Sequence, residues 1–310
     1  MIIWTIGAGG FLGRAITRQA LRHGIGTFDA APIPWTDEDA AATALQANAT
    51  AFAEHVDAED WGILWAAGHT DDPLDPDRDG RLLNAAITAI ALHRPAGRGA
   101  FFLSSVAGLV YAGSAHPPFD EFTEPRPRTD AGRAQLDREQ LAINGLDGVC
   151  PVVIGRLGSL FGAGQDIHHP HGLIPRLAVA SLSQQPLTLT SSLESTRDFL
   201  DVDDAALLAL HWTSRALQHP QSPPAVRVIA SGQPVSLGAL VHLMQDLEGR
   251  PVPVRIQHAG GHEPPATDLR LTPSDDGTAL GLVRTSLPAG IRRVVADAEE
   301  QWRQASKPRR

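Results

Sequence analysis

A short apolar run that ends in a glycine-rich turn opens the chain and limits what it can fold into. Residues 2–6 read Ile-Ile-Trp-Thr-Ile, and Gly7-Ala8-Gly9-Gly10-Phe11-Leu12-Gly13 follows directly. The apolar residues from Leu12 to Arg22 then recur with helical spacing. A glycine-rich turn between a strand and a helix aims backbone N–H groups and the positive end of the helix dipole at a phosphate group. This order of elements predicts the phosphate-binding turn of a dinucleotide site.

Three glycines in this turn are spaced so that each has its own physical role. Gly7 permits the tight turn, Gly10 lets the backbone approach a pyrophosphate, and Gly13 lets helix and strand pack closely. Phe11 and Leu12 lie between them and are expected to contact the cofactor as well.

The segment after the first helix indicates which dinucleotide is bound. Asp29 follows an expected second strand, at about the spacing of a carboxylate that binds the adenosine ribose; the alternative is an aspartate of a surface turn. No lysine or arginine occurs between Arg22 and Arg78, so a 2′-phosphate would find no cation in this segment. NAD is therefore predicted in preference to NADP, and Arg14 is the one nearby cation that could reverse this preference.

Apolar strands and helical segments alternate along much of the chain. We expect strands at residues 2–6, 27–29, 61–68, 100–105, 151–156 and 227–230, and a weak third strand at 33–35. We expect helices at residues 12–22, 37–57, 81–93, 133–144, 172–182, 205–217 and 236–247. The alternation predicts an α/β fold with a Rossmann-type doubly wound parallel sheet.

Composition narrows the classes of protein to which the chain can belong. The formal net charge is −9 over 310 residues, which argues against a general nucleic-acid-binding surface. No apolar run approaches the roughly 18–20 residues needed to span a bilayer, and the first residues do not resemble a signal peptide. Cys150 is the only cysteine, so no internal disulfide can form. The expectation is a cytoplasmic protein without membrane or nucleic-acid partners.

Five stretches, in order along the chain, carry a family resemblance. They are the glycine turn, Ala66-Ala67-Gly68, Phe102–Ser105 with Val110-Tyr111, Arg156–Gln165 and Thr196–Asp204. With these stretches the chain resembles the NAD-dependent epimerase/dehydratase family, the extended short-chain dehydrogenases/reductases, almost end to end. The resemblance implies NAD as cofactor, a nucleotide sugar or similar polyol as small-molecule partner, and a homodimer as a candidate assembly.

The resemblance also implies a smaller C-terminal substrate lobe beside the dinucleotide-binding domain. The domain would span residues 1–160 and be continued by about 195–235. The substrate lobe would then take residues 161–194 and 236–310.

The matched stretches imply contacts with cofactor and substrate. Ala66-Ala67-Gly68 would meet the cofactor where a strand ends. Ser105 is the candidate catalytic serine and would hydrogen-bond the substrate, with Ser104 as its competitor; the alternative is that both hydroxyls bind backbone groups. Ser159 would bind the substrate from the loop that leads into the lobe.

An arginine and several acidic residues share the last matched stretch. Arg197 would bind a phosphate of the substrate nucleotide, because a guanidinium suits bidentate phosphate binding. Its alternative is an ion pair with Asp198 or Asp201. Asp203 and Asp204 are expected to cap the helix that starts near residue 205.

One pair of positions departs from the family. The family places a Tyr-x-x-x-Lys pair at the start of a helix, where the tyrosine is the general acid/base and the lysine lowers its pKa and holds the cofactor ribose. Ala131 and Gln135 stand at these two positions. Alanine has no proton to give, and glutamine carries no positive charge. Tyr111 is the only tyrosine and is expected to form a pocket wall, and Lys307 is the only lysine.

Two functions therefore stay open from the sequence. The first is an epimerase/dehydratase-like enzyme with altered acid/base machinery, in which Asp130, Tyr111 or a substrate hydroxyl moves the proton. The second is a non-catalytic dinucleotide-binding sensor, or a partner subunit of an active relative.

A cluster of histidines suggests a metal site, but its geometry is poor. His168-His169-Pro170-His171 places a proline between adjacent ligands, and no carboxylate or cysteine cluster adjoins it. No metal is therefore expected, and the stretch is interpreted as a polar loop of the substrate lobe.

Overall fold

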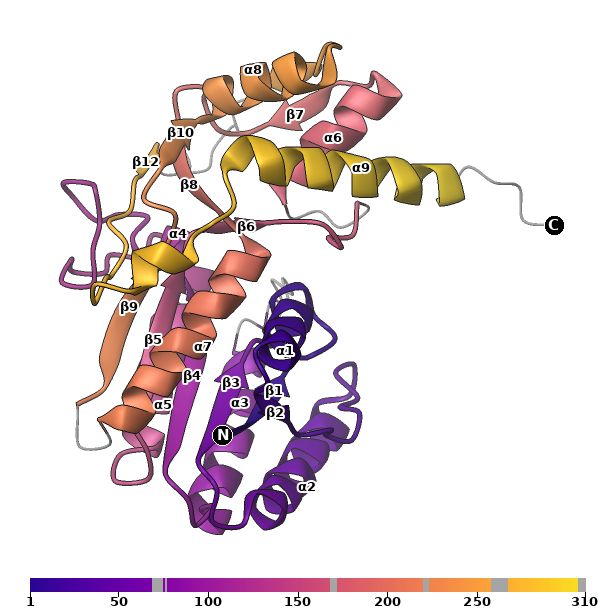
Figure 1. Ribbon diagram of the computed structural model, residues 1–310. Coiled ribbons are helices and arrows are strands. Elements are labelled where there is room, and N and C mark those ends of the chain that lie inside the picture. The colour runs from indigo at the N-terminus through magenta and orange to yellow at the C-terminus, as the bar shows by residue number, and fades with distance from the viewer. Residues whose placement is uncertain (69–74, 76, 168–171, 220–222, 258–266, 306–310) are drawn as a thin grey trace.

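Within the part of the chain that the structure describes, six parallel strands form the central sheet (Figure 1). This computed structural model describes residues 1–68, 75, 77–167, 172–219, 223–257 and 267–305. The strand order is β2-β1-β3-β4-β5-β9, and every neighbouring pair is parallel. The bounds are β1 Ile2–Ile6, β2 Gly26–Thr27, β3 Trp61–Trp65, β4 Gly99–Val106, β5 Val152–Leu157 and β9 Ala225–Ile229. The predicted Rossmann-type doubly wound sheet is confirmed.

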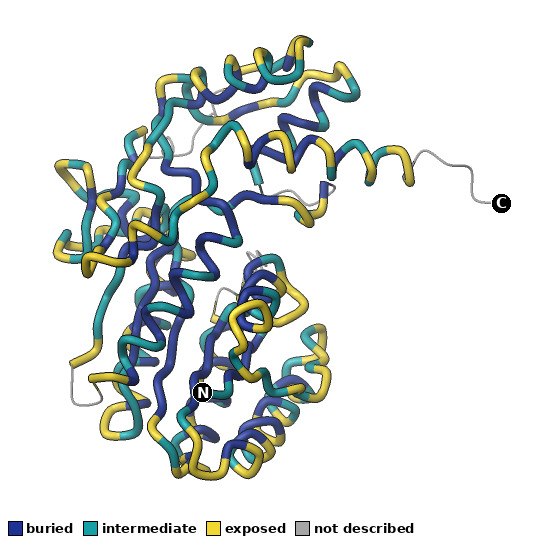
Figure 2. The backbone as a smooth tube through the Cα atoms, viewed as in Figure 1, coloured by how far each residue is buried: buried dark blue, intermediate teal, exposed yellow. Residues whose placement is uncertain are grey.

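Helices cover both faces of this sheet, which is why its strands are nearly continuous apolar runs. The central strands are buried, as the dark blue in Figure 2 shows, and Trp4 and Trp61 are each only 1% exposed. One face is covered by α1 (Phe11–Arg22) and α7 (Val202–Gln218). The other is covered by α2 (Glu38–Val56), α3 (Arg78–His93) and α5 (Asp130–Gly145), and the short α4 (Ala107–Val110) follows β4.

A smaller group of elements gathers beyond one end of the sheet and has its own apolar core (Figure 1). Its strands pair in the order β10-β8-β12, with β6 against β8 and β11 against β7. Because β8 belongs to this smaller sheet, α7 and β9 are the elements that return to the large one. The bounds are β6 Ser159–Phe161, α6 Leu173–Ser183, β7 Leu187–Leu189, β8 Thr196–Asp201, β10 Pro234–Ser236, α8 Leu237–Glu248, β11 Val254–Ile256, β12 Asp268–Leu269, η1 Ala279–Leu282 and α9 Leu287–Ala305.

The first half of the large sheet has one strand fewer than in the usual dinucleotide fold. That fold has the strand order 3-2-1-4-5-6, whereas here β2 is the edge strand and a loop leads from it into α2. The third strand expected at residues 33–35 is therefore wrong. Pro32 and Pro34 lack the N–H donors that a strand ladder needs, and Asp37 caps α2 by accepting a hydrogen bond from the Ala40 N–H at 3.0 Å.

Helix α9 is an element that we do not predict from the sequence. Pro288 and Gly290 interrupt the start of its apolar stripe, although Ile291, Val294 and Val295 continue it and are buried. Gly290 is needed for close packing, since a Cβ there would lie 2.5 Å from Cε2 of Phe161. The helix therefore packs into the core of the smaller lobe.

The cap of α7 also differs from the expectation. Asp201 is the N-cap residue and accepts a hydrogen bond from the Asp203 N–H at 3.0 Å, so the predicted capping by Asp203 or Asp204 is wrong. The Asp203 carboxylate pairs with Arg18 at 2.5 Å, and Asp204 accepts a hydrogen bond from the Thr285 N–H at 2.8 Å.

Candidate functional site

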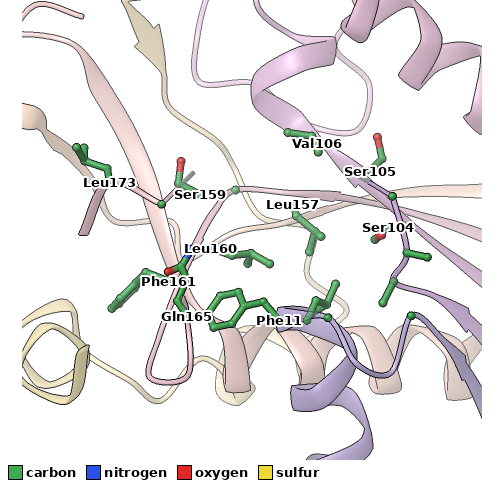
Figure 3. Close-up of a pocket in the computed structure, with 18 of the residues that line it drawn as sticks. Phe11, Ser104, Ser105, Val106, Leu157, Ser159, Leu160, Phe161, Gln165 and Leu173 are labelled. Atoms are coloured by element: carbon green, nitrogen blue, oxygen red, sulfur yellow. The ribbon is translucent and has the colours of Figure 1, made fainter. Parts of the chain in front are cut away.

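A cleft of about 1000 Å³ opens at the carboxyl end of the central strands. Crevices outside the carboxyl ends of parallel strands are where doubly wound sheets bind ligands. Figure 3 shows the cleft, with the side chains of Phe11, Leu157 and Leu160 near its centre. Both lobes contribute to its wall, through the glycine turn and the ends of β3 and β4 on one side and β6, α6 and residues 188–191 on the other.

The glycine turn packs so tightly that side chains are excluded at two of its positions. Gly7 has φ +90°, and a Cβ there would lie 2.7 Å from the backbone nitrogen of Ala67. A Cβ on Gly13 would overlap the carbonyl oxygen of Gly7. Gly10 precedes the first residue of α1 and lines the cleft, so the N-terminus of α1 faces the open volume. This arrangement offers backbone N–H groups to an anion.

The cleft wall carries an excess of positive charge although the chain is acidic overall. Among the described residues, five arginines and two aspartates line it. Such a surface attracts ligands that carry phosphate groups. The charged residues are Arg14, Arg78, Arg138, Arg176, Arg197, Asp79 and Asp166.

Two of these arginines contact the glycine turn or the loop that follows β2. Arg14 donates from Nη1 to the Gly9 carbonyl oxygen at 2.6 Å and from Nη2 to the Gly164 carbonyl oxygen at 2.7 Å, so it connects the glycine turn to the other lobe. Arg78, which sequence reasoning missed because it lies far along the chain, donates to the carbonyl oxygen of Trp35. Asp29 is exposed just after β2 and is not among the residues that line the cleft, so its contact with the ribose stays a prediction.

The two serines at the end of β4 point to opposite sides of the strand (Figure 3). Ser105 is buried, and its hydroxyl donates to Oε1 of Glu139 at 2.5 Å. Ser104 is half-buried and also lines the cleft. Because the Ser105 hydroxyl is already engaged, the geometry favours Ser104 for contact with a ligand, and a role for either serine stays a prediction.

Behind Ser105 lies a buried ionic network. Arg156 donates from Nη2 to Oε2 of Glu139 at 2.7 Å and from Nη1 to the Tyr111 hydroxyl at 2.8 Å, and that hydroxyl donates to the Asp120 carbonyl oxygen at 2.7 Å. Tyr111 is fully buried and does not line the cleft, so its expected place as a pocket wall is wrong. Burial raises the pKa of Tyr111, and the charge of Arg156 only partly opposes this. The phenol therefore lies in the core, with its hydroxyl bound to Arg156 and to the Asp120 carbonyl oxygen and away from the cleft wall.

Arg197 lines the cleft from β8, together with Ser159 of β6. Burial lowers the pKa of Arg197, and the negative charge of Asp268 only partly offsets this effect. The alternative ion pair with Asp198 or Asp201 is wrong. Asp198 accepts hydrogen bonds from the Ser231 and Gly232 N–H groups, and Asp201 pairs with Arg293 at 2.8 Å.

Comparison with known proteins identifies the family of this chain. The model described as the NAD dependent epimerase/dehydratase family matches residues 3–230. The chain belongs to the NAD-dependent epimerase/dehydratase family. A comparison with curated protein sequences gives no match.

Solved structures of similar fold include several enzymes of nucleotide-sugar metabolism. The UDP-glucose 4-epimerase of Thermotoga maritima with UDP-glucose has a TM-score of 0.78 and 17% identity, over 97% of this chain and 100% of that chain. The UDP-glucose 4-epimerase of Thermus thermophilus in complex with NAD has a TM-score of 0.74 and 17% identity, over 96% and 99% of the two chains. An NAD-dependent NDP-hexosamine 5,6-dehydratase involved in tunicamycin biosynthesis has a TM-score of 0.73 and 18% identity, over 99% of both chains.

Ala131 and Gln135, which we predict to stand at the family's Tyr and Lys positions, differ in their surroundings. Ala131 is exposed in the first turn of α5. Gln135 is 3% exposed and lines the cleft, where its Oε1 accepts a hydrogen bond from Arg138 at 2.7 Å. Asp130, one of the alternative proton carriers, pairs with Arg133 at 2.6 Å on the exposed surface of α5 and does not line the cleft.

Two further findings concern metals and membranes. The histidine stretch 168–171 lies outside the described residues, and among those that are described no cluster of three or more His, Cys, Asp or Glu side chains could hold a metal ion. None of the helices in the described ranges is both long and apolar enough to cross a membrane.

Proposed function

We propose that this protein binds NAD and a nucleotide sugar in the cleft, and that it does not carry out the tyrosine-dependent hydride transfer of its family. The observation that carries the proposal is the contrast between the two parts of the site. The glycine turn and the cleft arginines are suited to phosphate groups, whereas the only tyrosine is buried behind the cleft and the only lysine is Lys307 in the tail.

The choice of ligands follows from the cleft and from what similar proteins bind. The Thermus thermophilus structure contains NAD, and the Thermotoga maritima structure contains UDP-glucose. The cleft volume of about 1000 Å³ lies at the upper end of the roughly 300–1,000 Å³ of typical ligand pockets, which suits a large ligand or two adjoining ones. NAD is favoured over NADP because the exposed Asp29 lies directly after β2 and would repel a 2′-phosphate.

Loss of the acid/base group should leave little turnover. A positioned acid or base typically contributes about 100- to 10,000-fold in rate. A phenol with a pKa near 10 needs a nearby cation to ionise near neutrality, and here both the phenol and the lysine are absent from the two family positions. A protein that binds these ligands without this chemistry would act as a sensor or as a partner subunit.

The test combines binding and turnover. Calorimetric titration of the purified protein with NAD, NADP and UDP-glucose should give binding of NAD and UDP-glucose, with NADP at least about ten-fold weaker than NAD. A screen with NAD or NADH and common nucleotide sugars should show no turnover above background. Ala131→Tyr/Gln135→Lys should bring some turnover back, and robust turnover by the unaltered protein would overturn the proposal.

A second candidate is an enzyme that uses another acid/base group. The observation in its favour is that Asp166, a carboxylic acid in the loop after β6, lines the cleft. Turnover by the unaltered protein that disappears in Asp166→Asn would support this candidate over the first.

A further inference from the structure

A partly buried cation, Arg138, adjoins the position of the missing lysine. Arg138 lies on α5 three residues after Gln135 and donates from Nη2 to Oε1 of that residue at 2.7 Å. From Nη1 it donates to Oδ2 of Asp79, at the start of α3, at 2.8 Å. The Arg138 and Asp79 side chains are 13% and 10% exposed. All three residues line the cleft, so the group forms part of its wall.

The cluster of Gln135, Arg138 and Asp79 stands against the loop where β3 ends. A Cβ built on Gly68 would lie 3.3 Å from Oδ2 of Asp79 and 3.7 Å from Nη1 of Arg138. The residue before it, Ala67, is the one against which Gly7 of the phosphate turn packs. The cluster therefore belongs to the same stretch of wall as the dinucleotide turn.

This cluster has hydrogen-bond donors beyond those that the protein uses. A guanidinium carries five N–H groups. Nε of Arg138 is buried and has no hydrogen-bond partner among the described residues, and each of the two Nη atoms donates to one oxygen of the cluster. Each Nη atom carries two N–H groups and donates one within the cluster, so Arg138, which lines the cleft, has N–H groups left for an acceptor of a ligand.

We propose that Arg138, together with Gln135, binds the ribose of the nicotinamide half of NAD and so replaces the ribose contact of the missing lysine. This inference rests on the proposed binding of NAD. A ribose diol offers the oxygen acceptors that the guanidinium and amide donors need. Arg138 is the residue that selects the second ribose of the dinucleotide.

The charge of the cluster explains how the site can keep ribose binding and lose the family's catalysis. Asp79 neutralises Arg138 at 2.8 Å, whereas an unpaired lysine ammonium would leave a net positive charge beside the reacting oxygen. A nearly neutral cluster still donates hydrogen bonds to a diol. It does not provide the field that would lower the pKa of a nearby phenol, and Ala131 supplies no phenol.

Ligand fragments distinguish this role from a purely structural tie between α3 and α5. NAD and ADP-ribose both contain the second ribose, whereas ADP lacks it. Arg138→Gln should weaken NAD and ADP-ribose binding about ten-fold each and leave ADP binding unchanged, and Arg138→Lys should restore part of the loss. Gln135→Ala, which keeps the Arg138–Asp79 pair, should weaken the same two ligands by a smaller factor.

The control is Arg133→Gln, on the exposed side of the same helix, which should leave all three affinities unchanged. Calorimetry gives the affinities, and circular dichroism checks that each variant is folded. An equal loss for ADP, or no loss for NAD and ADP-ribose in folded variants, would overturn the inference. Failure of the unaltered protein to bind NAD would instead refute the proposed function, and the inference with it.

Discussion

Arg197 differs from Arg14 and Arg138, two other arginines of the cleft wall, in how little of its guanidinium is engaged by the described part of the protein. Its one hydrogen bond within the described part of the chain goes from Nη1 to the carbonyl oxygen of the neighbouring Thr196 at 2.9 Å. Arg14 and Arg138, by contrast, each have two Nη atoms bound to protein oxygens. A partly buried guanidinium with spare donors, at the cleft wall of the smaller lobe, is suited to an anionic ligand.

At the scale of a residue we therefore predict that Arg197→Ala weakens UDP-glucose binding and leaves NAD binding unchanged. Loss of a charge-assisted hydrogen bond of roughly 1.5–3 kcal/mol corresponds to a fall in affinity of about 10- to 100-fold. Calorimetric titration with each ligand measures this. Arg255→Ala, an exposed arginine of β11 outside the cleft, is the matched control. An unchanged affinity for UDP-glucose would refute the phosphate contact.

At the scale of an element, the turn between β1 and α1 contains glycines of very different importance. A Cβ on Gly9 would meet nothing within 4 Å, and this residue lines the open cleft. A Cβ on Gly13 would overlap the carbonyl oxygen of Gly7, which is backbone and cannot move without distorting the turn. The turn therefore has room for a side chain at Gly9 and none at Gly13.

We predict that Gly13→Ala loses NAD binding whereas Gly9→Ala keeps its overall fold and melting temperature. The added methyl group at position 13 must push the helix away from the turn, which moves the N–H groups of the anion site. Thermal unfolding and NAD titration of both variants measure the two effects. Equal behaviour of the two variants would contradict this account of the turn.

At the scale of the whole molecule, the C-terminal helix organises part of the cleft from far along the chain. Asp297 of α9 accepts a hydrogen bond from the Gly164 N–H at 2.8 Å, and Gln301 donates to the Gln165 carbonyl oxygen at 3.1 Å. Gly164 in turn accepts the hydrogen bond from Arg14 of the other lobe. The loop after β6 is therefore held between α9 and α1.

We predict that Asp297→Ala loosens this loop without unfolding the protein. The hydrogen bond from the Gly164 N–H to the carboxylate is charge-assisted and worth roughly 1.5–3 kcal/mol, so the amide hydrogens of residues 162–167 should exchange about ten-fold faster or more. Hydrogen–deuterium exchange with mass spectrometry measures this. Glu300→Ala, an exposed residue of the same helix, should leave the exchange unchanged. Unaltered exchange in Asp297→Ala would show that the loop is held by other contacts.

Much of the fold can be predicted from the sequence because its information is local. The apolar runs that became β1, β3, β4 and β5 stand between glycines and helical segments, and only a parallel sheet covered on both faces buries such runs. The smaller lobe is harder to predict, because its strands are short and pair across long distances in the chain. Helix α9 is hard to predict because Pro288 and Gly290 disfavour a helix locally. The need for a glycine at 290 follows from its packing against Phe161, which is distant in the chain.

The sequence by itself determined the family and showed that neither a tyrosine nor a lysine stands at positions 131 and 135, because motifs and missing functional groups can be read without coordinates. The tertiary structure alone decided which side chains meet at the cleft. It buried Tyr111 behind the wall, committed the Ser105 hydroxyl to Glu139, and brought Asp79 and Arg138 together from two helices. These outcomes depend on contacts between residues distant in the chain, which local patterns do not encode.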